Sequence, residues 1–187
     1  MSNIPDNGWT IERFLERLSS DEPVPGGGSA AALAGSLGCA LGAMACRITL
    51  KRRTLSTGGR AHLTRSLQEL DQLVAKMERL IKDDARAYGS LVRAFKLQRR
   101  VGAARMAAIR APVRICEAAA DAHEIITGLE PFASTLLRSD LRAGRALLRG
   151  AFQAAEMTAR INFVGKDVPA DAVRFRSKLA QLRERMR

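Results

Sequence analysis

The uncharged run from Ala30 to Cys46, which directly follows the turn "PVPGGGS", is the feature that most constrains the fold. Gly35, Gly38 and Gly42 recur in it at spacings of three and four residues. Glycine inside a helix costs about 1 kcal/mol relative to alanine, so several glycines on one stripe indicate that another helix or a bound ring approaches the backbone closely. The run is short for a membrane span and is rich in Gly and Ala. A buried helix in a soluble helical domain is therefore the better interpretation.

Helical periodicity continues along the chain, and no stretch alternates convincingly like a β-strand. Apolar spacings of three and four predict five or six helices that together form one domain over residues 1–187. The predicted fold is all-α, an antiparallel up-and-down bundle joined by short loops. The expected helices cover about residues 11–18, 29–51, 63–92, 102–127 (with Pro112 inside), 139–163, and a basic stretch after Pro169.

The net charge of +12 makes the surface attractive to nucleic acid, anionic membranes or small polyanions, or simply keeps the chain soluble. Aromatic residues make up only 4% of the chain, and no helix-turn-helix signature is visible. A nucleic-acid-binding module is consequently the least favoured function, although the arginine-rich C-terminal run keeps it open.

The cysteines and histidines give no metal-binding pattern. Cys39, Cys46 and Cys116 form no Cys-x-x-Cys motif, and the two histidines are not paired. We therefore expect no metal, cysteines packed as small apolar residues, and a reducing cytoplasmic location, which the lack of an apolar signal core in "MSNIPDNGWTIERFLERL" also favours. His62 and His123 lie among polar residues, and both are expected at the surface.

The glycine turn has two interpretations. A glycine-rich loop that opens a helix presents free N–H groups at the positive end of the helix dipole, which makes it a natural cradle for a ligand or an anion. It is not a phosphate-binding P-loop, because no Gly-Lys-Ser/Thr follows. Alternatively, the glycines form a tight turn that lets two helices meet.

Three segments resemble the cyclodeaminase/cyclohydrolase family, and together they cover about residues 12–163. The most specific is "FLERLSSDEPVPGGGSAAALAGSLGCALGAMACRIT", with its P-x-P-G-G-G-S run. "DDARAY" (Asp83 to Tyr88) and "SDLRAGRALLRGAFQAAEMTARINF" are weaker matches in the right order. In the last segment Thr158 stands where the family has an asparagine.

The resemblance implies an all-helical homodimer that binds a one-carbon derivative of tetrahydrofolate as its substrate, with no tightly bound cofactor. It places the glycine turn at the folate site, where bare backbone would let the pterin approach. The substrate-binding residues expected there are Pro25, Gly26, Gly27, Gly28, Ser29, Tyr88 and Asn162.

Opening a methenyl bridge requires a base that takes a proton from water and an acid that helps a nitrogen leave, and a carboxylate beside the cationic substrate can do both. Asp84 is the first candidate and Asp140 the second. Without the resemblance, Asp84 would be read as a solvated helix residue. Asp140, after Ser139, would be read as a first-turn charge that complements the helix dipole.

Lys51, Arg52 and Arg53 follow the buried helix. They could hold the anionic glutamate tail of a cellular folate, or they could be the cations that a helix C-terminus favours.

The predicted function is hydrolysis of methenyltetrahydrofolate to formyltetrahydrofolate. The alternatives are a formiminotetrahydrofolate cyclodeaminase that releases ammonia and a folate- or pterin-binding protein without catalytic activity.

Overall fold

The computed structural model describes residues 8–164 and 168–187 of the chain. The described part is helical and contains no strand, which confirms the all-α prediction. Its elements are α1 (Ile11–Leu18), α2 (Gly27–Leu50), α3 (Thr57–Leu97), α4 (Val101–Gly128), the short 3₁₀ turn η1 (Glu130–Phe132), α5 (Thr135–Ile161), the 3₁₀ turn η2 (Ala170–Ala172) and α6 (Val173–Arg185).

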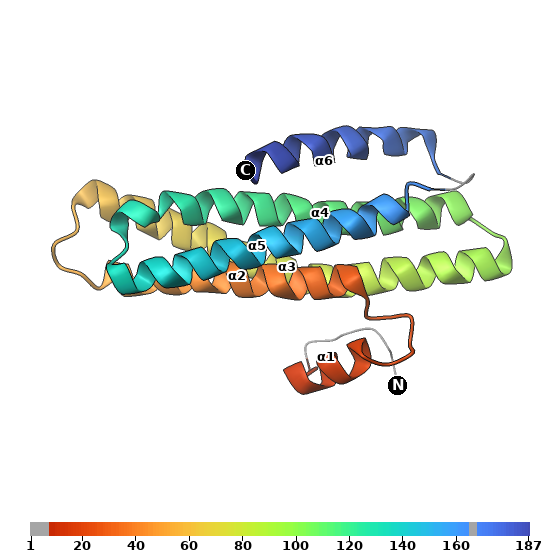
Figure 1. Ribbon diagram of the computed structural model, residues 1–187, viewed down its shortest axis with the longest axis horizontal. Helices are drawn as coiled ribbons and strands as arrows, with labels where there is room; N and C mark the ends of the chain where they lie inside the picture. Colours follow the sequence, from red (N-terminus) through yellow and green to blue (C-terminus); the bar gives the residue numbers. More distant parts are fainter. Residues whose placement is uncertain (1–7, 165–167) are drawn as a thin grey trace.

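Helices α2 to α5 form the bundle, in which α2 packs on both α3 and α5, and α4 packs on the same two helices from the other side. Figure 1 shows α1 beside the start of α2, and α6 lying along α4. The hairpin of α3 and α4 projects past the start of α2 and the end of α5. The start of α2 and the end of α5 are thus set against the middle of two longer helices.

Several helix boundaries differ from the predicted ones because a local cap decides each of them. The α2 helix begins at Gly27, with Gly26 as its N-cap, two residues before the predicted Ser29. The α5 helix begins at Thr135, where the Ser134 hydroxyl accepts a hydrogen bond from the Leu137 N–H. The prediction that Asp140 sits in the first turn of a helix is therefore wrong, because it lies in the second.

Helix α2 approaches α5 backbone to backbone. A Cβ on Gly38 would lie 2.9 Å from the carbonyl oxygen of Gly144, and a Cβ on Gly144 would lie 3.2 Å from that of Gly38. A similar substitution at Gly42 would overlap Ile126 of α4. The prediction of close approach at the glycine stripe is confirmed. By length and composition α2 could also span a membrane, but most of its apolar window is buried against the other helices.

The two histidines occupy different environments. His62 is exposed and stacks on Phe132, with ring centroids 5.2 Å apart. His123 is only 6% exposed, so the prediction that it lies at the surface is wrong. Its chain neighbours are polar, but the helical repeat places it on the same side of α4 as Ala119 and Ile126, which are both fully buried.

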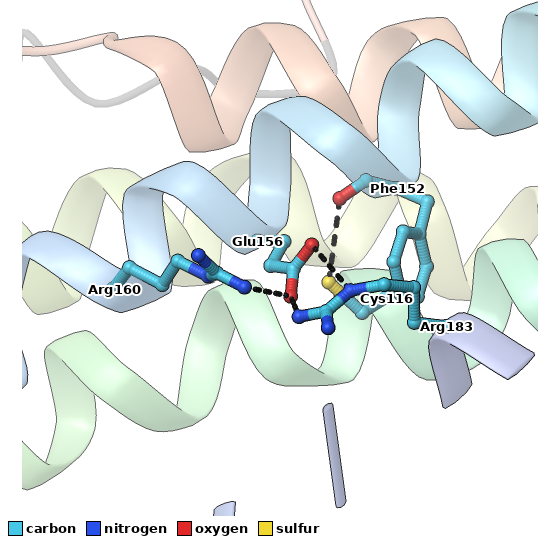
Figure 2. A network of polar contacts seen from close by, with 5 residues as sticks. All are labelled: Cys116, Phe152, Glu156, Arg160 and Arg183. Atoms are coloured by element: carbon cyan, nitrogen blue, oxygen red, sulfur yellow. Dashed lines mark hydrogen bonds and ion pairs between the residues drawn. The ribbon is translucent and has the colours of Figure 1, made fainter. Parts of the chain in front are cut away.

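Helix α6 is fixed to the bundle by a buried carboxylate. Glu156 of α5 is 9% exposed, and it pairs with Arg183 of α6 and with Arg160 one turn further along α5. Figure 2 shows both guanidinium groups converging on this carboxylate above the Cys116 thiol, which donates a hydrogen bond to the Phe152 carbonyl oxygen. A buried charge requires such partners, so the position of α6 depends on Glu156.

Candidate active site

A cavity of about 240 Å³ lies where α2 begins and α5 ends. Its walls come from the segment before α2, the first residues of α2, the middle of α3, and parts of α4 and α5. The lining residues are Pro23, Val24, Gly26, Gly27, Gly28, Asp84, Tyr88, Ala108, Thr158 and Asn162.

Asp84 is the carboxylic acid of this cavity. It projects from α3, is 7% exposed, and its Oδ2 lies 3.1 Å from the Ser29 hydroxyl. Its carboxyl group occupies the space that a side chain on Gly28 would need, because a Cβ there would overlap all three carboxyl atoms. The bare backbone at Gly28 is therefore required by Asp84 itself, whereas the family resemblance implied a requirement of the ligand.

Burial raises the pKa of Asp84 from 3.8 to about 6. Hydrogen bonds from the side chain and the backbone of Ser29 oppose this rise by stabilising the carboxylate. Because α2 starts beside the carboxyl group, the helix dipole acts in the same direction. A pKa of about 6 allows the group to accept and return a proton near neutral pH, as a general acid–base catalyst must.

Two further predicted residues face the same cavity. Tyr88, one turn after Asp84 on α3, is 43% exposed and forms part of the lining. Asn162 is buried at the end of α5, and its amide nitrogen donates to the carbonyl oxygens of Ala108 (3.2 Å) and Thr158 (2.9 Å). These bonds tie the end of α5 to α4 and hold the wall of the cavity in place.

Some residues of the glycine turn line the cavity, and others are buried behind its wall. Gly26, Gly27 and Gly28 line the cavity, whereas Pro25 and Ser29 are buried outside the lining. Ser29 touches Asp84 and so supports the acid rather than the space beside it.

Asp140 and the basic triplet lie at the opposite end of the bundle. About six turns of α5, or about 33 Å, separate Asp140 from Asn162. Lys51 caps the far end of α2, about 36 Å from Gly27. Lys51 and Arg53 are exposed, while Arg52 donates to the Phe132 carbonyl oxygen at 3.2 Å. Within one chain, these residues are not brought to the cavity.

Four lining residues were not predicted from the sequence as site residues: Pro23, Val24, Ala108 and Thr158. Thr158 faces the start of α2, since a Cβ on Gly27 would lie 3.3 Å from its hydroxyl oxygen. Its position one turn before Asn162 on α5 was the available signal. Within residues 8–164 and 168–187, no group of three His, Cys, Asp or Glu side chains could hold a metal ion.

Comparison with known proteins shows which family the chain is similar to. Residues 10–181 match the family model described as formiminotransferase-cyclodeaminase. A methenyltetrahydrofolate cyclohydrolase from Methylorubrum extorquens is 33% identical over 132 residues, which are 63% of this chain and 62% of the relative. A formimidoyltransferase-cyclodeaminase from Sus scrofa is 30% identical over 192 residues, 94% of this chain and 33% of the relative.

The chain thus spans about three fifths of the first relative and one third of the second. The fold has a solved counterpart in the formiminotetrahydrofolate cyclodeaminase of Thermotoga maritima, with a TM-score of 0.88 and 21% identity, covering 96% of this chain and 90% of that one. Because the family model matches most of its length, the chain belongs to the formiminotransferase-cyclodeaminase family.

Proposed function

We propose that the protein hydrolyses methenyltetrahydrofolate to formyltetrahydrofolate, with Asp84 as the acid–base group. The observation that carries this proposal is a buried carboxyl group, with a pKa raised to about 6, in the wall of a cavity lined by the glycine turn. The similarity to a cyclohydrolase at 33% identity supports the choice of reaction.

The reaction needs one proton to be taken up and one to be given back. The Asp84 carboxylate removes a proton from water as the water oxygen bonds to the cationic methenyl carbon. The protonated Asp84 then donates to one bridging nitrogen as its bond to that carbon breaks. The remaining hydroxyl proton passes to solvent, which leaves the formyl C=O. A cation and water thus give a neutral formyl product and one proton.

The size of the cavity limits how much of a folate it encloses. Pockets that bury a drug-sized ligand measure about 300–1,000 Å³, and this cavity is about 240 Å³. We infer that the ring system occupies the cavity beside Gly27 and Asp84 while the benzoyl-glutamate portion stays outside, near Tyr88. The half-exposed phenol ring of Tyr88 is positioned to pack against the benzoyl ring of the bound folate.

A formiminotetrahydrofolate cyclodeaminase is the second candidate, supported by the matching family model and by the relative from Sus scrofa. In that reaction a nitrogen of the folate attacks the formimino carbon, and ammonia leaves after it receives a proton. Asp84 would again supply and remove protons, so the same cavity serves either chemistry. A protein that binds folate without turnover is the third candidate.

We propose a homodimer as the working form, built on the outer surface of α2 and α5. Apolar side chains stand exposed there, with Leu37 on α2 and Leu136, Met157 and Ile161 on α5 between 50% and 83% exposed. If the two copies ran antiparallel, Asp140 and the Lys51–Arg53 end of one copy would approach the partner's cavity. Three buried free cysteines fit the reducing cytoplasm as its location.

The decisive experiment follows the ultraviolet absorbance of methenyltetrahydrofolate mixed with purified protein near neutral pH. We expect decay well above the spontaneous rate, lost in Asp84→Asn and retained in the control Asp83→Asn. Asp83 is the neighbouring acid, about 40% exposed at its side chain and paired with Arg114 outside the cavity.

Absence of acceleration by the wild-type protein would exclude the cyclohydrolase. Ammonia release from formiminotetrahydrofolate would then identify the cyclodeaminase. If neither substrate turns over, the binding of tetrahydrofolate is measured by fluorescence. Saturable binding would then support a protein that binds folate without catalysis.

A further inference from the structure

A basic groove runs between α3 and α4 on the surface away from the α2–α5 side of the bundle. It consists of two hollows of about 320 and 590 Å³, which share Ser90. Its floor is made of small side chains, and guanidinium groups line its rims. The floor residues are Ala87, Ser90, Ala94, Ala103, Ala104, Ala107 and Ala111, the rim arginines are Arg86, Arg93, Arg99, Arg100, Arg110 and Arg114, and exposed Leu97 lies at one end.

Among the described residues, one of these rim arginines has an acidic partner. Asp83 lies in the groove and pairs with Arg114 at 3.6 Å. Within the part of the chain that the structure describes, no ion pair is found for the other five. Like charges gathered along one groove repel one another and oppose folding. A bound anionic partner would remove this repulsion.

The opposite side of α4 shows how a helix fills a groove with charged rims. There α6 buries Leu179, Leu182 and Met186. Around these apolar contacts, Lys178 pairs with Glu117 at 2.7 Å, and Arg185 pairs with Asp121 and Glu124 at 2.8 Å. A basic helix therefore lies on an acidic face of α4. The α3–α4 groove has the same kind of apolar floor and the opposite charge.

We propose that the α3–α4 groove docks an acidic amphipathic helix of a partner protein, with its apolar stripe on the alanine floor and its Asp and Glu side chains on the arginine rims. Arginine suits this role because its planar guanidinium binds a carboxylate through two parallel hydrogen bonds. The groove extends about 21 Å along α3, from Asp83 to Leu97, which accommodates about four helical turns.

The floor distinguishes this occupant from a nucleic acid. Single-stranded nucleic acids are held by aromatic side chains on which bases stack, and no aromatic residue lines either hollow. The methyl groups of Ala104, Ala107 and Ala111 offer nothing to a phosphodiester chain. They do allow the backbone of a helix to approach closely. Figure 1 shows that the α3–α4 hairpin projects beyond α2 and α5, and residues of this hairpin line the larger hollow.

The test measures fluorescence anisotropy of a labelled peptide of about 20 residues, long enough to be helical, with Leu and Ala on one face and Glu on both flanks. The full chain is titrated against it, against the same peptide with Gln for Glu, against unstructured poly-glutamate, and against duplex DNA. The groove variant is Arg93→Glu with Arg110→Glu, one change on each helix. The matched control is Arg138→Glu with Arg142→Glu, two exposed arginines near the start of α5 for which no ion pair is found among the described residues.

We expect the Glu peptide to bind and the groove variant to weaken its binding about tenfold or more, since two ion-pair sites are lost. The control variant shows how much binding is lost when two arginines outside the groove are reversed. The Gln peptide shows how much binding remains without the carboxylates. A polar filler of the floor, Ala107→Gln, should also weaken binding without any change in charge. Tighter binding of DNA or of poly-glutamate than of the helical peptide would overturn the proposal. The proposal would also be overturned if the Glu peptide did not bind, or if the control variant lost as much affinity as the groove variant.

Discussion

The Ser29 hydroxyl lies 3.1 Å from the Oδ2 of Asp84 and 3.1 Å from the carbonyl oxygen of Ile81. A hydroxyl has one proton, so it fully serves only one of these acceptors at a time. When Asp84 is ionised, the proton favours the carboxylate. When Asp84 is protonated, it can donate to Ser29 while Ser29 donates to Ile81. Both protonation states of Asp84 are thus accommodated without movement of the backbone.

Removal of this hydroxyl should raise the pKa of Asp84 further above its ordinary value. The Ser29 side chain stabilises the carboxylate and so lowers the pKa of Asp84. In Ser29→Ala this effect is lost, while burial still raises the pKa. The measurement is a ¹³C nuclear magnetic resonance titration of the carboxyl group. The control is Ser66→Ala, which changes a buried serine on α3 and should leave the titration of Asp84 unchanged. An unchanged or lower pKa in Ser29→Ala would show that the hydroxyl does not act on Asp84.

Gly28→Ala should destabilise the fold by about 1–3 kcal/mol, because the new methyl group meets the Asp84 carboxyl group. Chemical denaturation measures the change. In an Asp84→Ala background the cost should fall, since the carboxyl group is gone and the two changes are coupled. Gly58→Ala is the matched control, since nothing lies within 4 Å of its Cβ position. Equal cost in both backgrounds would mean that Gly28 is needed for another reason.

The raised pKa of Asp84 makes stability fall as pH rises. Between about pH 4 and pH 6 the folded chain holds a proton at Asp84 that the unfolded chain has lost. A rise from 3.8 to about 6 corresponds to a penalty of roughly 3 kcal/mol once Asp84 is ionised in the folded state. Asp84→Asn has no such charge, so it should be more stable than wild type at pH 7 and lose this advantage near pH 4. Denaturation at both pH values checks the sign, and a constant difference would contradict it.

Glu156→Gln should loosen α6 without unfolding the bundle. The change removes the charge that holds Arg183 and Arg160, at an expected cost of about 1–2 kcal/mol. Hydrogen exchange should accelerate in α6 amides and remain slow in α2. Glu184→Gln, which breaks an exposed pair between the last turn of α6 and Arg187 just after it, should have little effect. Uniform acceleration in all helices would instead indicate global destabilisation.

The local features of the fold were predictable from the sequence because they depend on short-range rules. Apolar spacing identifies the long helices, and the glycine stripe indicates close packing of α2. The family motifs place Asp84, Tyr88 and Asn162 together, and the structure brings them to one cavity. Ala108 carries no chemical signal, and only three-dimensional packing shows that it completes the wall.

Other positions depend on long-range geometry. The resemblance covers the segments that contain Asp140 and Lys51, but a sequence motif does not tell at which end of a long helix a residue lies, and within one chain both are far from the cavity. His123 is buried because the helical repeat outweighs the polarity of its chain neighbours. The Gly28–Asp84 contact joins residues on different helices, and no spacing rule connects them.

The backbone contact between Gly38 and Gly144 has a consequence for ligand choice. It fixes the separation of α2 and α5, and with it the gap between Gly27 and Thr158 at the cavity. Main-chain geometry thus sets how closely the start of α2 and the end of α5 approach each other at this wall of the cavity. A change in the ligands that the cavity accepts would therefore require substitutions in the segment before α2 or at Tyr88. These parts of the wall do not depend on the Gly38–Gly144 contact.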